Sequence, residues 1–305
     1  MTKFLANTAL FLTIIFLPFL VIEGIVTYKL RNNFVVTLHS DWHTLEGHNS
    51  DVLFIGNSRV WTHIDPVAVG YHIGANCEDL AQDGQSVNML WWKFKEYTKH
   101  NKKPKEIYVQ ADPAFLRICS ELYRPHRFRS YMFMDRYDIG PLKQLKGYKP
   151  YYKYMPMLAI GKQSVQFITN RTDNIIGLDT SKGFAAHGGM WVEGGDTWSR
   201  PGDLRFVNDG SIDYLDSFKN YAEQQGIKCY FIFTPVSYPT YSQMINSMEY
   251  KQVLSKHGIN VVDFNDARYD DSTLFSNHMH LNAKGVNVFM QQLLSDTTLF
   301  RTFRK

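Results

Sequence analysis

The chain alternates short apolar runs with amphipathic stretches, and this alternation limits its fold more than any other feature. Most of the runs have the length and composition of buried strands: Val52–Ile55, Cys77–Leu80, Glu106–Gln110, Ile227–Thr234 and Ile259–Phe264. The amphipathic stretches have the apolar spacing of helices: Val87–His100, Asp213–Gln225, Ser242–His257 and Ala283–Leu294. Strands that alternate with helices pair in parallel, because each helix returns the chain to the same end of the sheet. The sequence therefore predicts an α/β fold on a parallel sheet.

The apolar N-terminus predicts a membrane anchor. The run Phe4–Val26 follows Lys3 and is interrupted mainly by Asn7 and Glu23, and about 20 apolar residues span a bilayer as a helix. A cleaved signal peptide and a buried core helix are the alternatives. No Ala-x-Ala type site follows the run, which is long for a signal peptide, so we favour an uncleaved signal anchor. Basic residues flank both ends, so the charge pattern leaves the orientation open.

The chain is expected to have three parts. Residues 1–28 form the anchor, residues 29–50 a polar connector, and residues 51–305 the α/β domain. A long insertion, about 115–208, interrupts the alternation and is expected to lie over the active-site edge of the sheet. Its aromatic residues are interleaved with arginine and lysine. They either bind a sugar polymer or an anionic headgroup, or simply pack the insertion onto the domain.

Composition excludes some classes of function. A net charge of +4 over 305 residues, with no long basic run, does not indicate a nucleic-acid-binding protein. The three cysteines, Cys77, Cys119 and Cys229, lack the CxxC spacing of a zinc knuckle. They allow at most one disulfide, and they do not decide the compartment.

A serine and a histidine are expected to meet at one edge of the sheet. Gly56 permits a sharp turn after the first strand, so Ser58 lies at the carboxyl end of a central strand, where open α/β sheets bind their ligands. His280 follows the last strand and precedes the closing helix, which places it at the same edge. A serine hydroxyl is a poor nucleophile until a histidine takes its proton. The order of residues therefore indicates serine-based chemistry, although a solvated serine at an ordinary turn is the alternative.

The motifs Gly56-Asn57-Ser58, Gly84 and His280-Leu281, in this order, resemble the SGNH (GDSL-like) hydrolase superfamily. The amino-acid sequence around Ser58 and His280 most resembles that of the membrane-anchored DltD-like and alginate-acetylation-type members. The resemblance covers about residues 50–112 and 226–295. It implies a three-layer flavodoxin-like sheet, here with a long insertion and one N-terminal transmembrane helix.

The resemblance also implies roles for individual residues. Ser58 is the expected nucleophile, His280 the base, and the amides of Ser58 and Gly84 part of an oxyanion hole. Asn277 stands where the superfamily carries its acid, three residues before the histidine. A neutral asparagine can still orient an imidazole, and Asp270 or Asp271 is the alternative partner through space.

A second departure concerns the oxyanion hole. Gln110-Ala111-Asp112 replaces the block that usually supplies an asparagine donor. Asp112 either lines the site or caps the next turn, and Arg59 either holds a substrate anion or forms an ion pair. Asn57 is expected to support the serine turn. His278 is expected beside the site or at the surface rather than as a metal ligand, and no cofactor or metal is expected.

Two functions remain open. The first is a membrane-anchored serine esterase or O-acyltransferase that acts on ester-linked acyl groups of cell-surface glycans or related polymers, through an acyl-enzyme on Ser58 with His280 as base. It implies a single-pass protein of a bacterial cell membrane, with its catalytic domain outside the cytoplasm and a role in polysaccharide modification of the cell envelope. The resemblance also implies a membrane-bound O-acyltransferase as partner. The second is a catalytically decayed module that binds a surface glycan or scaffolds a membrane acylation complex. Neither function involves nucleic acid.

Overall fold

The chain divides into two compact units, one with Met1–Thr37, Trp42–Thr44 and Ser120–Asp179, the other with Leu38–Asp41, Leu45–Cys119 and Thr180–Lys305. The computed structural model describes residues 1–32, 45–122, 128–132, 136–154, 182, 184–191, 206–207, 209–245 and 248–304. The connector 29–50 and the insertion 115–208 therefore lie largely outside the described residues.

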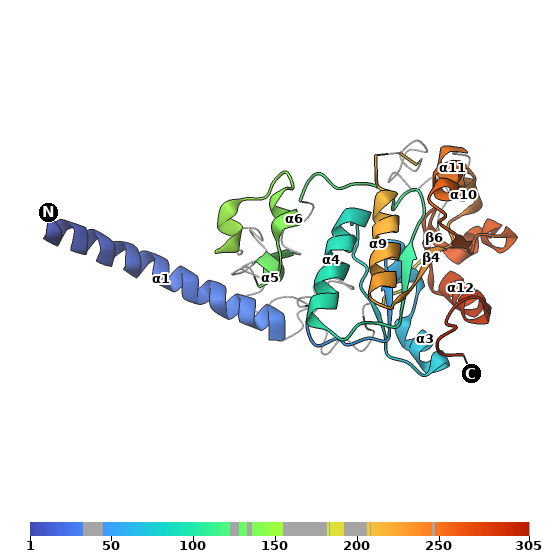
Figure 1. The fold of residues 1–305 in the computed structure, drawn as a ribbon, viewed down its shortest axis with the longest axis horizontal. Helices are drawn as coiled ribbons and strands as arrows, with labels where there is room; N and C mark the ends of the chain where they lie inside the picture. Colours follow the sequence, from blue (N-terminus) through green and yellow to red (C-terminus); the bar gives the residue numbers. More distant parts are fainter. Residues whose placement is uncertain are drawn as a thin grey trace. The chain divides into compact units, whose positions relative to one another are not determined.

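The second unit contains a parallel sheet, which confirms the predicted fold class (Figure 1). Its strands follow the order β2-β1-β3-β4-β5 and all pair in parallel: β1 (Val52–Ile55), β2 (Cys77–Asp79), β3 (Glu106–Gln110), β4 (Lys228–Phe233) and β5 (Val261–Asp263). This is the flavodoxin-like order, in which β1 and β3 flank the point where the winding reverses. A short antiparallel pair lies beyond β5: β6 (Phe275–Asn277) and β7 (His280–Leu281).

The α-helices described in this unit agree with the sequence. They are α2 (Ser58–His63), α3 (Pro66–Ile73), α4 (Val87–His100), α9 (Asp213–Gln224), α10 (Tyr238–Ile245), α11 (Met248–Lys256) and α12 (Ala283–Ser295). The stretch Ser242–His257, expected to be mostly helical, falls on α10 and α11, and α10 begins earlier, at Tyr238.

Alternation along β1 separates the two faces of the sheet. Val52 and Phe54 point to one face, where they join a buried core shared with α2, α3 and α12. Leu53 and Ile55 point to the other face and are also fully buried. The core contributions of the helices include Val60, Val69, Phe289 and Leu293. A strand that is buried on both faces is why the run Val52–Ile55 is apolar without interruption.

Helices α4 and α9 lie side by side on one side of the strands (Figure 1). The rings of Trp91 and Phe218 meet edge-on, with centroids 5.0 Å apart, and Phe94 packs 5.5 Å from Phe218. Leu90, Phe94 and Tyr97 are buried as their spacing predicts, and Trp91 is half-buried. This aromatic contact joins two helices that are far apart in the sequence.

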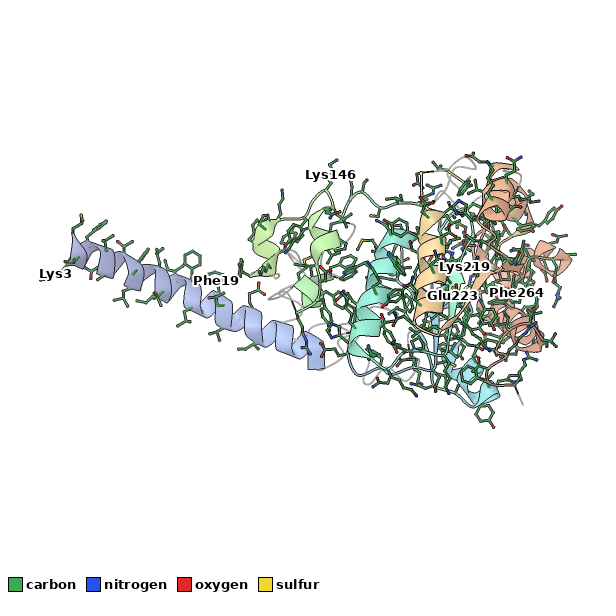
Figure 2. The ribbon with its side chains drawn as sticks, viewed as in Figure 1. Lys3, Phe19, Lys146, Lys219, Glu223 and Phe264 are labelled. Atoms are coloured by element: carbon green, nitrogen blue, oxygen red, sulfur yellow. The ribbon has the colours of Figure 1, made fainter. Side chains whose placement is uncertain are left out.

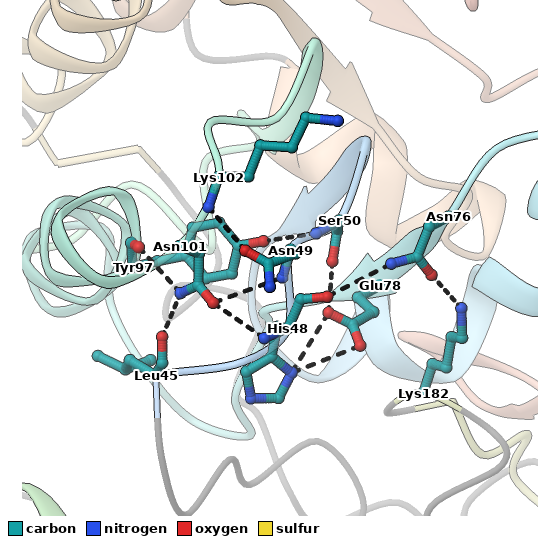
Figure 3. A network of polar contacts seen from close by, with 10 residues as sticks. All are labelled: Leu45, His48, Asn49, Ser50, Asn76, Glu78, Tyr97, Asn101, Lys102 and Lys182. Carbon is teal, nitrogen blue, oxygen red and sulfur yellow. Dashed lines mark hydrogen bonds and ion pairs between the residues drawn. The ribbon is translucent and has the colours of Figure 1, made fainter.

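A polar network fixes the approach to β1 (Figure 3). The side-chain carbonyl of Asn101 accepts the His48 amide at 2.9 Å, and the Tyr97 hydroxyl accepts the Ser50 amide at 2.9 Å. Asn49 in turn accepts the Lys102 amide at 2.8 Å. These bonds tie the chain before β1 to the end of α4, so the start of the central strand is held in place.

The first unit contains α1 (Thr2–Asn32), α5 (Arg129–Met132), α6 (Gly140–Lys143) and the 3-10 helix η3 (Pro150–Lys153). In α1, the segment Thr2–Ile25 is long and apolar enough to span a membrane. Its apolar side chains project outward, among them Phe19 (Figure 2). Length and composition support the predicted transmembrane helix, and a signal sequence has the same properties.

Close packing at the start of α12 generates a test of the fold. A Cβ atom added to Gly285 would lie 2.1 Å from the Leu274 carbonyl oxygen, whereas one added to Gly188 would meet nothing within 4 Å. We expect Gly285→Ala to lower the free energy of unfolding by about 3 kcal/mol, because backbone must move. Gly188→Ala should stay within about 0.5 kcal/mol. Denaturant unfolding measures both, and equal effects would contradict the packing at Gly285.

Candidate active site

Ser58 is the first residue of α2, directly after the turn that ends β1. The turn requires glycine, because a Cβ atom on Gly56 would lie 2.2 Å from Val60 Cγ2 and 2.4 Å from Gln110 Oε1. Asn57 caps the helix, and its side-chain oxygen accepts the Arg59 amide at 3.2 Å. The serine therefore follows a tight, capped junction between a buried strand and a helix, as the sequence predicts.

Ser58, His280 and Asn277 are hydrogen-bonded in a row. Ser58 Oγ lies 2.8 Å from His280 Nε2, and His280 Nδ1 lies 3.0 Å from Asn277 Oδ1. The two residues of the β6–β7 pair thus meet a serine more than 200 positions earlier in the chain. Both ring nitrogens of His280 are engaged in this row.

The contacts of Asn277 determine which nitrogen of His280 carries the proton. Asn277 Oδ1 accepts the backbone amides of Met279 and His280, each at 2.9 Å. Since this atom accepts from two amides, it is the oxygen of the side chain, and His280 Nδ1 must donate to it. The neutral imidazole then has its lone pair on Nε2, which faces the Ser58 hydroxyl. Asn277 can therefore set the tautomer that a general base needs, although it carries no charge.

A buried set of contacts from the end of β3 holds both residues that flank Ser58. The Gln110 side-chain oxygen accepts the Asn57 amide at 2.8 Å. Asp112 forms an ion pair with Arg59, and both side chains are fully buried. Gln110 Nε2 also donates to Asp112 at 2.5 Å, which joins the two contacts. The serine turn is thus fixed to the neighbouring strand on either side of the serine.

The sequence left two roles open for each of Asp112 and Arg59: Asp112 lines the site or caps the next turn, and Arg59 holds a substrate anion or forms an ion pair. Asp112 Oδ1 accepts the amides of Ala114 and Phe115, at 3.0 and 3.1 Å, so it caps the next turn. The Arg59 guanidinium lies over the Phe233 ring, 5.7 Å from its centroid. Arg59 has no exposed surface, and it forms the ion pair that was one of its two expected roles.

Gly84 lies in the turn after β2, with a left-handed backbone (φ +67°). Among the described residues, no acceptor takes a hydrogen bond from the amides of Ser58 and Gly84. Both amides are therefore available to an oxygen of a substrate. The Gln110 side-chain amide, at the end of β3, donates to Asp112.

Two histidines that sequence reasoning did not assign lie beside His280. His63, at the end of α2, is fully buried, and its ring centroid lies 6.2 Å from that of His280. His187 lies 4.9 Å from His280 and 5.8 Å from Trp61, measured between ring centroids. His187 belongs to the insertion, and its backbone forms a parallel bridge with Asn282. Neither histidine belongs to a recognisable motif, so only the fold reveals them.

The acidic alternatives, Asp270 and Asp271, are not bonded to His280 Nδ1. Asp271 caps the turn at Thr273, at 2.9 Å, and pairs with Lys284 at 3.6 Å. Asp270 lines a pocket between the loops that follow β4 and β5. The His278 carbonyl accepts the Ser237 amide at 3.1 Å. The partner of His280 Nδ1 is therefore Asn277 and not an aspartate.

Burial governs the protonation of the histidines. Burial, with smaller contributions from His187 and Arg59, lowers the pKa of His280 to about 3. Burial likewise lowers the pKa of His63 well below its usual value, and His280 and Arg59 add to this shift. Both imidazoles are therefore neutral at pH 7, and His280 is free to accept a proton.

Fold and site together define an α/β protein of flavodoxin-like strand order with a Ser-His-Asn row at the carboxyl edge of its sheet. No protein-family model matches the chain, and no curated protein does. Among solved structures, it is similar to a proposed acylhydrolase from Bacteroides fragilis, with 11% identity, 83% of this chain and 88% of that chain covered, and a TM-score of 0.38. It is also similar to a protein from Streptococcus pneumoniae described as a proposed platelet activating factor, with 9% identity, 95% and 99% covered, and a TM-score of 0.33. Function must therefore be argued from the geometry of the site.

The buried ion pair predicts an asymmetric effect on stability. Asp112→Asn leaves Arg59 buried without its counter-ion and should cost about 3–5 kcal/mol of unfolding free energy. Arg59→Met should cost at least about 1 kcal/mol less, because the Asp112 carboxylate keeps three other donors. Denaturant unfolding measures the free energy of unfolding of both variants. Lys146→Met, which removes the exposed ion pair with Glu121, is the control. A larger loss for Arg59→Met would contradict this account.

The neutral partner of His280 predicts the pH dependence. A base works only when unprotonated, so a lowered pKa moves the acid limb of kcat/KM below the usual range of histidine. For ester hydrolysis we expect kcat/KM to be independent of pH above about pH 5. Asn277→Asp adds a negative charge, which raises the pKa of His280, so the limb should move toward neutral pH. Asn277→Ala removes the acceptor and should lower kcat about 100-fold. An acid limb that is the same in wild type and Asn277→Asp would exclude His280 as the titrating base.

Proposed function

We propose that the protein is a serine esterase or O-acyltransferase that works through an acyl-enzyme on Ser58. The observation that carries the proposal is the row in which Asn277 holds His280 with its Nε2 atom 2.8 Å from Ser58 Oγ. This distance lies within the range for direct proton transfer between a nucleophile and its base. The same arrangement of nucleophile, base and orienting group recurs in unrelated acyl-transfer enzymes.

The first half of the proposed reaction forms the acyl-enzyme. Ser58 Oγ attacks the carbonyl carbon of an ester while His280 Nε2 takes the hydroxyl proton. The carbonyl oxygen becomes an oxyanion, which the free amides of Ser58 and Gly84 are suited to bind. When the tetrahedral intermediate collapses, the bond to the alcohol breaks and His280 returns the proton to the leaving oxygen. The acyl group then remains on Ser58.

The second half decides between hydrolysis and transfer. Water or an acceptor hydroxyl attacks the acyl carbon, and His280 takes its proton. Collapse then releases Ser58, which recovers the proton from His280. Water gives a free acid, whereas a sugar hydroxyl gives a new ester. The two outcomes use the same residues, so they differ only in what occupies the space next to the acyl group.

We propose that the substrates are acylated glycans of the cell surface. A pocket of about 370 Å³ lies at the carboxyl edge of the sheet, between the loops after β4 and β5. Its walls include Tyr238, Tyr241 and Tyr269, and its polar groups include Asp266 and Asp270. Aromatic rings beside polar groups suit a sugar, whose ring has apolar faces and polar edges. The residues that line this pocket do not include Ser58, His280 or Asn277, so it would hold a part of the glycan away from the reacting ester.

We also propose the setting of the reaction. The protein would be attached to a bacterial cell membrane with its catalytic domain outside the cytoplasm, and the apolar segment Thr2–Ile25 of α1 supports the membrane attachment alone. A membrane-bound O-acyltransferase is the proposed donor where the reaction is a transfer. The uncleaved anchor is part of the proposal, and a mature N-terminus beyond α1 would argue against it.

Reaction of Ser58 with a fluorophosphonate tests the proposed function. We expect stoichiometric labelling of the wild type at neutral pH, no labelling of Ser58→Ala, and at least about 100-fold slower labelling of His280→Ala. Ser242→Ala, in exposed surroundings on α10, serves as the matched serine control and should label normally. A folded wild type that fails to label would favour the alternative of a non-catalytic binding module. Adding oligosaccharide to a turnover with p-nitrophenyl acetate then separates the two reactions, since transfer yields acetylated sugar.

A further inference from the structure

Among the described residues, the His63 side chain makes one hydrogen bond, and that bond reaches the chain beside the proposed base. His63 Nε2 accepts the backbone amide of Leu281 at 3.0 Å. Leu281 follows His280 directly on β7, and it is fully buried. The ring of His63 packs edge-on against His280 and Phe289, with centroids 6.2 and 6.3 Å away. Because His63 and Leu281 are both fully buried among the described residues, water does not reach the hydrogen bond between them.

The position of His63 on α2 gives this bond its significance. α2 has six residues, with Ser58 at its start and His63 at its end. A helix this short is effectively rigid, so both ends move together. His63 therefore links the helix that carries the nucleophile to the strand that carries the base.

The tautomer of His63 shows that the acceptor is kept at a cost. Because Nε2 accepts the Leu281 amide, the proton of the neutral ring is on Nδ1. Nδ1 is buried and has no hydrogen-bond partner in the described part of the chain. An unsatisfied buried donor is unfavourable, and an apolar side chain would avoid it. Burial also lowers the pKa of His63, which keeps the ring neutral and its acceptor available.

We infer that His63 is a positioning residue for the reaction proposed above: it sets the distance between Ser58 and His280 by holding the Leu281 amide. It acts through His280 and does not touch the substrate. Three observations carry the inference: the 3.0 Å bond, the common helix of Ser58 and His63, and the burial of the contact. The inference rests on the proposed function, since it concerns the rate of the Ser58 reaction.

Three variants of His63 separate the acceptor from the bulk of the ring. In His63→Gln the side-chain amide reaches about as far as Nε2, so its oxygen can accept the Leu281 amide. In His63→Asn the amide reaches only about as far as Nδ1, which gives a matched polar control. In His63→Phe the ring is kept and the acceptor is lost. Turnover of p-nitrophenyl acetate gives kcat and KM, and hydrogen exchange of the Leu281 amide reports the bond itself.

We expect His63→Phe and His63→Asn to lower kcat about 10- to 100-fold with KM changed less than about 3-fold. His63→Gln should recover kcat to within about 3-fold of the wild type. The Leu281 amide should be protected in the wild type and in His63→Gln, and should exchange faster in the other two. Activity of His63→Phe equal to that of the wild type, or of His63→Gln no better than His63→Asn, would overturn the inference.

The failure of this inference is distinguishable from failure of the proposed function. If the wild type itself neither turns over ester nor reacts with a fluorophosphonate at Ser58, the proposed function is wrong, and the role of His63 falls with it. If the wild type reacts and the His63 variants react equally fast, only the role of His63 is wrong. A kcat loss accompanied by an equal loss of folded protein, measured by near-UV circular dichroism, would indicate a structural role and would also overturn it.

Discussion

The buried contact between Arg59 and Asp112 is the interaction on which the geometry of the site depends. It connects the residue after Ser58 to the end of β3, while Gln110 connects the residue before Ser58 to the same strand end. β1 and β3 are paired in parallel, so both carboxyl ends lie at one edge and such contacts are short. A paired charge without water is costly to separate. The serine turn is therefore held by the sheet as well as by its own residues, Gly56 and Asn57.

The base reaches the serine by a different route. His280 belongs to the small β6–β7 pair, outside the central sheet, and it depends on local bonds for its orientation. Asn277 fixes its tautomer, and Asn282 caps α12 directly after it, accepting the Gly285 amide at 3.1 Å. The two halves of the site are thus built separately, one on the sheet and one on the turn before α12. Close contact between them requires a connection such as the bond from His63 to Leu281.

Much of this could be predicted from sequence, and the remainder could not for a physical reason. Strand positions follow from apolar runs, and the meeting of Ser58 and His280 follows from parallel topology, which brings strand ends to one edge. His63 and His187 left no such signal, because their contacts join segments that no period or motif relates. The sequence also does not show that Arg59 pairs with Asp112 out of contact with water, because burial is a property of the packed structure.

Because Asn277 is neutral, the site lacks the negative charge that would stabilise a protonated His280. Where an aspartate would stabilise the imidazolium through its charge, Asn277 supplies only a dipole, and burial opposes the charged ring. In the proposed reaction, the imidazolium that forms when His280 takes the Ser58 proton would therefore gain most of its stabilisation from the oxyanion that forms at the same moment. Opposite charges that appear together attract each other strongly only at short range in a dry site. A site of this kind depends on the separation between serine and histidine more than one with an acid does. That dependence explains why both sides of the contact are held by buried polar bonds.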